Sequence, residues 1–163
     1  MKIEKAMFGA GCFWGVQYTF QKIPGVLKTE VGYSGGNIKN PSYEEVCNDK
    51  SGHAEVVYIE FDPEKVSYAD LLSVFWKSHN PTTINMQWPD VGTQYRSIIF
   101  YYSTQQKKEA EESLKRVQKI IPKKIVTEIK KASEFYPAEN YHQDYVNKNG
   151  ANSCHIANNP YLS

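Results

Sequence analysis

The sequence predicts an α+β fold with two layers: a mixed β-sheet with packed helices, a ferredoxin-like core in the order β-α-β-β-α-β, and an irregular C-terminal tail. Hydrophobic runs with period two are separated by runs with helical spacing, which favours this class. The 163 residues suit one domain and are too few for two ordinary ones. Because no repeat or linker-like change of composition divides the chain, we expect a single domain over residues 1–163, with 132–163 as a loop-rich tail.

Five stretches have the side-chain pattern of strands. Residues 55–61 alternate, with Val57, Ile59 and Phe61 on one face. Residues 95–102 are dense in β-branched and aromatic side chains, which suits a buried central strand. The other strand-like stretches are 3–8, 26–33 and 125–130.

Helices are expected between these strands. Ser67 followed by Asp70 resembles a capping box, and apolar residues at helical spacing come next. Ser103 followed by Gln106 begins a second helix, which Pro122 ends. The other expected helices span about 12–20 and a short stretch near 138–148.

Composition excludes several classes of protein. The chain has 19 Lys and Arg against 18 Asp and Glu, so nothing indicates charge-driven binding to nucleic acid or to a membrane. No segment approaches the roughly 20 apolar residues of a membrane span. The first residues do not resemble a signal peptide, so we expect a cytoplasmic protein. The three cysteines cannot build a disulfide framework, and there are 12 tyrosines.

The most informative local pattern surrounds Cys12, in Gly-Ala-Gly-Cys-Phe-Trp-Gly at residues 9–15. A strand-like run enters the glycines and a helix leaves them, so Cys12 is expected at the first turn of that helix. Unpaired N–H groups and the helix dipole favour a thiolate there, and the thiolate is the nucleophilic form. Two other interpretations compete. A dinucleotide fingerprint fails because Gly15 comes one residue late, whereas a merely buried Cys12 stays open.

The other two cysteines have different surroundings. Cys47 precedes a polar stretch that contains nothing to activate it, and we interpret it as a small buried hydrophobic residue. Cys154 lies in the irregular tail, well placed to reach another sulfur. Cys154 and His155 lack the companions of a zinc site, so no metal is expected.

Polar residues gather in three further segments. Glu55 opens a strand at a point where it can lie near Cys12. Residues 90–97 form a polar stretch that runs into the expected central strand, and residues 138–145 cluster hydrogen-bonding groups ahead of Cys154. Together they predict a polar cleft at the edge of the sheet.

Five separated blocks of this chain closely resemble the pattern of methionine sulfoxide reductase A. They keep the order of that family and extend over nearly the whole chain. The resemblance implies reduction of methionine-S-sulfoxide, free or in peptides and proteins, to methionine. The blocks are residues 11–15, 31–36, 52–56, 90–97 and 138–143.

The resemblance also implies catalytic roles. Cys12 matches the nucleophile that attacks the sulfoxide sulfur, and Glu55 matches the acid that protonates the oxygen. Tyr43 and Tyr95 match two phenols that hydrogen-bond this oxygen. Cys154 matches the resolving cysteine, which forms a disulfide with Cys12 after the Cys12 sulfenic acid appears.

A second set of residues is implied to bind the substrate. Phe13 and Trp14 match the pocket for the substrate methyl group, and Asp90 matches a carboxylate that orders water. His142 and Tyr145 are the remaining substrate-binding candidates.

The family resemblance implies thioredoxin as the reductant and no metal, flavin or nicotinamide cofactor. We expect a monomer. Four features depart from the family pattern: Ser153 replaces a tyrosine, Asn140 replaces a common acid, Met-Gln-Trp-Pro stands at residues 86–89, and no cysteine follows Cys154 in this sequence. Recycling is therefore expected to use one disulfide, Cys12–Cys154.

Three other functions are consistent with some of these residues. A peroxide-reducing thiol enzyme would use the same two cysteines, Cys12 and Cys154. A non-catalytic domain would bind oxidised peptides through Phe13, Trp14 and Trp88. A cysteine hydrolase would pair Cys12 with His53 or His142, although the acid nearby favours protonation of an oxygen instead.

Overall fold

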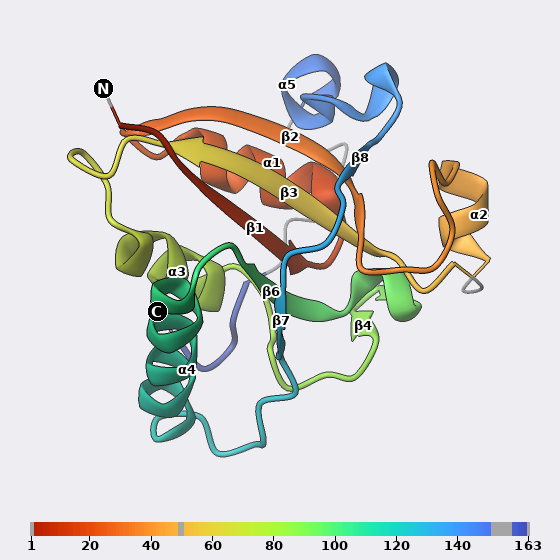
Figure 1. Cartoon of the computed structure of the whole chain (residues 1–163). Helices are drawn as coiled ribbons and strands as arrows, with labels where there is room; N and C mark the ends of the chain where they lie inside the picture. Colours follow the sequence, from red (N-terminus) through yellow and green to blue (C-terminus); the bar gives the residue numbers. More distant parts are fainter. Residues whose placement is uncertain (1, 49–50, 151–157, 163) are drawn as a thin grey trace.

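The computed structural model describes residues 2–48, 51–150 and 158–162, and a six-stranded mixed sheet lies at its centre (Figure 1). The strands lie in the order β7-β6-β1-β3-β2-β8. The β6–β7 pair is parallel, and the other pairs of this sheet are antiparallel. The strands are β1 (Glu4–Ala10), β2 (Val26–Ser34), β3 (Ala54–Phe61), β6 (Ser97–Tyr101), β7 (Glu128–Lys131) and β8 (Tyr136–Pro137).

Three helices cover one face of the sheet: α1 (Phe13–Gln21), α3 (Tyr68–Lys77) and α4 (Thr104–Gln118). Their apolar side chains form one core with alternate residues of the strands, such as Phe8 and Ile59. No helix within the described ranges has the length and apolar character of a bilayer span.

The opposite face of the sheet is covered by the tail. Met7, Val56 and Phe100 are buried on this face and pack against Phe135. Figure 1 shows the chain between β7 and β8 crossing this side of the sheet, away from α1. The expected mixed α+β fold is confirmed, with helices on one face and an irregular segment on the other.

Two predicted helix starts are confirmed in atomic detail. The Ser67 hydroxyl accepts a hydrogen bond from the Asp70 backbone N–H at 3.0 Å, and the Asp70 carboxylate accepts one from the Ser67 N–H at 3.0 Å. The Ser103 hydroxyl accepts from the Gln106 N–H at 3.1 Å. These caps satisfy backbone donors that the first helical turn leaves unpaired.

Three predicted boundaries were wrong. The strand expected from residue 95 begins at Ser97, because Thr93–Tyr95 forms a 3-10 turn, η1. The strand expected at 125–130 forms only from Glu128, because the Val126 N–H bonds the Pro81 carbonyl instead of a strand. The helix expected near 138–148 is divided in two at Asp144, which has a left-handed φ of 55°. Its parts are the 3-10 turn η2 (Asn140–His142) and α5 (Tyr145–Asn149).

Short elements that the sequence patterns did not predict also contribute to the fold. Helix α2 (Tyr43–Cys47) begins with a capping box in which the Ser42 hydroxyl accepts from the Glu45 N–H. A small hairpin is formed by β4 (Met86–Gln87) and β5 (Asp90–Val91), which pair antiparallel.

Candidate active site

Cys12 lies where β1 passes into α1. It is the residue that caps the helix, and its side chain is half-buried. Gly11, just before it, has a φ of +99°, and a Cβ there would lie 2.9 Å from the Gln87 Cγ, so this position requires glycine. The predicted position of Cys12 at the positive end of a helix is confirmed, and such a position favours a thiolate.

Glu55 lies beside Cys12 and is 1% exposed. Side chains alternate along β3, so Glu55 shares the helix-covered face with Val57. Its Oε1 accepts a hydrogen bond of 3.2 Å from the backbone N–H of Phe13, the first residue of α1. The carboxyl group and the Cys12 side chain therefore meet at the same helix end.

The phenols of Tyr43 and Tyr95 lie near Glu55. Burial raises the pKa of Tyr43 above its usual range, and a hydrogen bond with the Cys47 side chain and the charges of Glu55 and Cys12 raise it further. Burial also raises the pKa of Tyr95, and the charge of Glu55 adds to this effect. Both phenols therefore stay protonated at neutral pH and can donate hydrogen bonds.

Aromatic rings form a wall next to Cys12. The rings of Trp14 and Tyr145 are stacked, with centroids 3.8 Å apart and an interplanar angle of 7°. The Trp14 Nε1–H donates to His142 Nδ1 at 3.0 Å. Phe13 is buried at 5.3 Å from the His142 ring and 5.6 Å from the Tyr33 ring. The structure thus brings Phe13, Trp14, His142 and Tyr145 together.

The two histidines considered for a cysteine hydrolase have other roles. His142 Nδ1 accepts the Trp14 hydrogen bond, and burial lowers the pKa of this histidine, so its ring is neutral. His53 is buried and uses both nitrogens: Nδ1 accepts from the Gly36 N–H at 3.1 Å, and Nε2 lies 2.6 Å from the Ile38 carbonyl oxygen. Both nitrogens of His53 and the Nδ1 of His142 are thus engaged by groups other than the Cys12 thiol.

Asp90 is placed by the β4–β5 hairpin. It pairs with Gln87, whose side chain packs against Gly11 and accepts from the Asn80 N–H at 2.9 Å. The charge of Asp90 is among those that raise the pKa of Tyr95. The hairpin therefore holds this carboxylate at the same end of α1 as Cys12.

Two glutamines that the sequence patterns did not single out, Gln17 and Gln143, hold the tail in place. Gln143 accepts a hydrogen bond from the Val31 N–H and donates one to the Val31 carbonyl, both at 2.9 Å. Gln17 is buried in α1 and accepts from the Asp144 N–H at 2.9 Å. Gln143 is the last residue of the block 138–143, which is the one sequence signal that points to it.

The two remaining cysteines are Cys47 and Cys154. Cys47 is exposed at the end of α2, so its interpretation as a buried hydrophobic residue was wrong. The reason is that this five-residue helix buries only Val46, and the next side chain points away from the core. Cys154 lies outside the described residues. Within the described ranges, no three His, Cys, Asp or Glu side chains are grouped to hold a metal ion.

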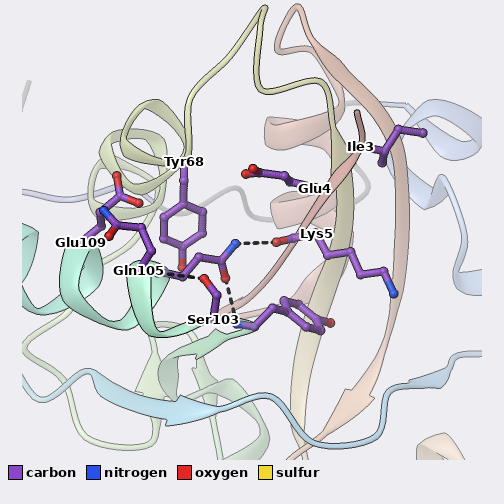
Figure 2. A pocket seen from close by; sticks show the side chains of 9 residues that line it. Ile3, Glu4, Lys5, Tyr68, Ser103, Gln105 and Glu109 are labelled. Carbon is purple, nitrogen blue, oxygen red and sulfur yellow. Dashed lines mark hydrogen bonds between the residues drawn. The ribbon is translucent and has the colours of Figure 1, made fainter. Parts of the chain in front are cut away.

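A separate pocket of about 340 Å³ lies at the start of β1, at the other end of this strand from Cys12 (Figure 2). Gln106 spans it, donating to the Lys5 carbonyl at 2.7 Å and accepting from the Tyr102 N–H at 2.9 Å. Tyr68, which also lines the pocket, is buried, and its hydroxyl has no hydrogen-bond partner among the described residues. None of the candidate site residues lines this pocket.

Comparison with known proteins identifies relatives of the chain. A family model described as peptide methionine sulfoxide reductase matches residues 4–163. A peptide methionine sulfoxide reductase of Brassica napus is 56% identical over 145 residues, which cover 89% of this chain but only 56% of that protein. The MsrA protein of Methanothermobacter thermautotrophicus is 54% identical over 157 residues, which cover 95% of this chain and 93% of that one.

Solved structures agree with these matches. The reduced form of Mxr1 from Saccharomyces cerevisiae matches with a TM-score of 0.89 and 32% identity, over 99% of this chain and 92% of that one. Mxr1 in complex with Trx2 matches with a TM-score of 0.65 and 22% identity, over 96% and 91% of the two chains, and this likeness concerns the fold.

Proposed function

The chain belongs to the peptide methionine sulfoxide reductase family, and on this premise we propose that it reduces methionine-S-sulfoxide, free or in peptides and proteins, to methionine. One observation carries the proposal: Cys12 caps α1, and the Glu55 carboxyl accepts a hydrogen bond from the next backbone N–H. A nucleophile and an acid are thus held at one point on rigid elements. The choice of the S epimer follows the family resemblance.

In the first step the Cys12 thiolate attacks the sulfoxide sulfur. Glu55 supplies a proton to the sulfoxide oxygen, which requires the neutral acid, and burial favours that form. The phenols of Tyr43 and Tyr95 donate hydrogen bonds to the same oxygen as charge develops on it. Thiol and sulfoxide become sulfenic acid and thioether, so the oxygen passes from substrate sulfur to Cys12.

The aromatic wall provides a place for the rest of the substrate. Phe13 and Trp14 would contact the methyl group, while His142 orients the Trp14 indole through the bond between Nε1–H and Nδ1. The Tyr145 ring stacks on this indole. Asp90 would order water beside the Tyr95 phenol.

In the second step the sulfenic acid condenses with a thiol to a disulfide, and water leaves. We assign the thiol to Cys154 by its match to the family pattern, and thioredoxin then reduces the Cys12–Cys154 disulfide. The solved complex of Mxr1 with Trx2 supports a thioredoxin partner for this fold. Cys47, which is exposed and hydrogen-bonded with Tyr43, is the competing thiol.

Single-turnover chemistry tests both steps. Reduced protein mixed with a methionine sulfoxide substrate, without reductant, should release about one equivalent of methionine. Cys12→Ser should release none, and methionine release by this variant would refute the mechanism. Cys154→Ser should keep the first turnover and lose turnover with thioredoxin, whereas Cys47→Ser, the matched control, should keep both. Mass spectrometry of the oxidised protein identifies the disulfide.

We also propose a core topology, a domain organisation, an oligomeric state and a cellular compartment for this chain. The spatial order β6-β1-β3-β2 supports a ferredoxin-like core, and we treat residues 1–163 as a single catalytic domain with the tail at 132–163. We also propose that the protein is a monomer. A cytoplasmic setting would supply the reducing conditions that the thiols need. Light scattering of the eluted protein tests the monomer, and a dimer mass would contradict it.

A further inference from the structure

The β4–β5 hairpin has its polar side turned inwards and its apolar side turned to solvent. Gln87 and Asp90 are opposite each other, so their side chains share one face, and Gln87 packs there against Gly11. Met86 and Val91 form the neighbouring pair and therefore share the other face. Val91 is 65% exposed on that face.

Two further exposed apolar residues lie near this pair in the sequence. Trp88, in the turn of the hairpin, is 74% exposed, and Ile84, just before β4, is 72% exposed. We call Ile84, Met86, Trp88 and Val91 the hairpin outer face. A solvent-facing apolar cluster of this kind, with a large aromatic residue in it, is typical of an interaction surface.

The hairpin outer face lies close to the candidate site. Gly11 is next to Cys12 and contacts Gln87, which is next to Trp88. A Cβ built on Gly11 would lie 3.0 Å from the Gln87 Cβ. With a Cα–Cβ bond of about 1.5 Å at each end and a Cα–Cα step of about 3.8 Å on each side, the Cα atoms of Cys12 and Trp88 are at most about 14 Å apart. An extended polypeptide advances about 3.3 Å per residue, so a chain whose sulfoxide meets Cys12 reaches this surface within about four residues.

We propose that the hairpin outer face binds apolar side chains that flank methionine sulfoxide in an unfolded or extended substrate polypeptide. The occupant follows from the chemistry of the substrate. Methionine is itself an apolar core residue, so its neighbours in an unfolded segment are often apolar too. The four residues of the face are uncharged, and Asp90 belongs to the inner face. Arg96 and Glu128 line a pocket together with Ile84, but they form an ion pair of 2.9 Å with each other. This inference rests on the proposed reductase function and narrows its substrates.

Three substrates separate this inference from the proposed function. They are N-acetyl-methionine sulfoxide, a peptide with alanines around methionine sulfoxide, and the same peptide with leucine and phenylalanine within four residues. Wild-type protein should reduce all three, with the apolar peptide showing the lowest KM. If the wild-type protein reduces none of them, the proposed function itself fails.

Substitution then tests the surface. In Trp88→Ser, kcat/KM for the apolar peptide should fall about tenfold through KM, because the apolar contact area is lost. The other two substrates should change less than twofold, and Trp88→Phe should recover most of the loss. Val91→Ser should give a smaller loss with the same pattern. Ile120→Ser is the control, because Ile120 is 64% exposed just beyond α4.

A binding measurement without turnover completes the test. In Cys12→Ser protein, calorimetry should show tighter binding of the apolar peptide than of the alanine peptide, and Trp88→Ser should remove the difference. An equal loss with all three substrates, or no loss with the apolar peptide, would overturn the inference. A change confined to the KM for thioredoxin would also overturn it and would assign the face to the reductant.

Discussion

Replacing Gln143 with alanine should loosen the attachment of the tail to β2 and weaken substrate binding. The Gln143 side chain makes three hydrogen bonds: one from the Val31 N–H and one to the Val31 carbonyl, both 2.9 Å, and one to the Ala138 carbonyl at 3.2 Å. At about 1 kcal/mol each, their loss should lower the free energy of unfolding by about 3 kcal/mol. Val31 is fully buried, so its N–H would lose its partner without gaining a ready one from water.

The assay combines stability and kinetics. Urea unfolding should report the loss of about 3 kcal/mol, and the melting temperature should fall by about 10 °C for a chain of this size. KM should rise while kcat for N-acetyl-methionine sulfoxide changes less, because the segment carries His142 and Tyr145 but not Cys12 or Glu55. Asn149→Ala is the control, because the hydrogen bond from the Asn149 side chain to the Tyr145 carbonyl is exposed and water can replace it. A Gln143→Ala protein with wild-type stability and KM would refute this reasoning.

Three further outcomes are expected. Glu55→Gln keeps an oxygen that accepts from the Phe13 N–H, so the fold should survive. The single-turnover rate should fall at least 100-fold, by about two orders of magnitude or more, because the amide cannot supply the proton. A rate within about threefold of wild type would exclude Glu55 as the acid. Burial lowers the pKa of His79 to about 4 in the folded protein, from 6.5 in the unfolded chain. As the pH falls from 6.5, the unfolded chain therefore takes up the proton first. The free energy of unfolding should drop by about 3 kcal/mol between pH 6.5 and 4. His79→Gln should flatten that urea-unfolding profile. Tyr68→Phe removes a buried hydroxyl that lacks a partner among the described residues, so the melting temperature should stay or rise, and a clear fall would show that the hydroxyl is satisfied.

The parts of the fold that the sequence predicted are those fixed by local patterns. The helix starts at Ser67 and Ser103 depend on contacts three residues apart, and both are confirmed. The strand expected at 125–130 failed because distant partners compete for its backbone. The Ile125 N–H bonds Gln118 Oε1 at 2.8 Å, and the Val126 N–H bonds the Pro81 carbonyl at 2.8 Å. A hydrophobic alternation in sequence carries no information about such partners.

The candidate site shows the same limit. The position of Cys12 followed from a glycine-rich strand-to-helix junction, which is local. Its proximity to Glu55 depends on the pairing of β1 with β3, and alternation on β3 then places Glu55 on the face of α1. Cys47 was misjudged because the burial of a residue in a five-residue helix depends on which side meets the core, and α2 was not predicted.

The aromatic wall depends on two glutamines, a residue type that sequence patterns usually place at the surface. Gln17 accepts from the Asp144 N–H, and the Gln143 side chain is bound to Val31, so residues 143–144 are attached to α1 and β2 at once. His142 and Tyr145 lie immediately before and immediately after these two residues, and both contact Trp14. The indole is therefore oriented by residues 128 and 131 positions further along the chain. Since the chemical residues Cys12 and Glu55 belong to the sheet and α1, the tail governs how substrate is held, while the sheet governs the chemistry.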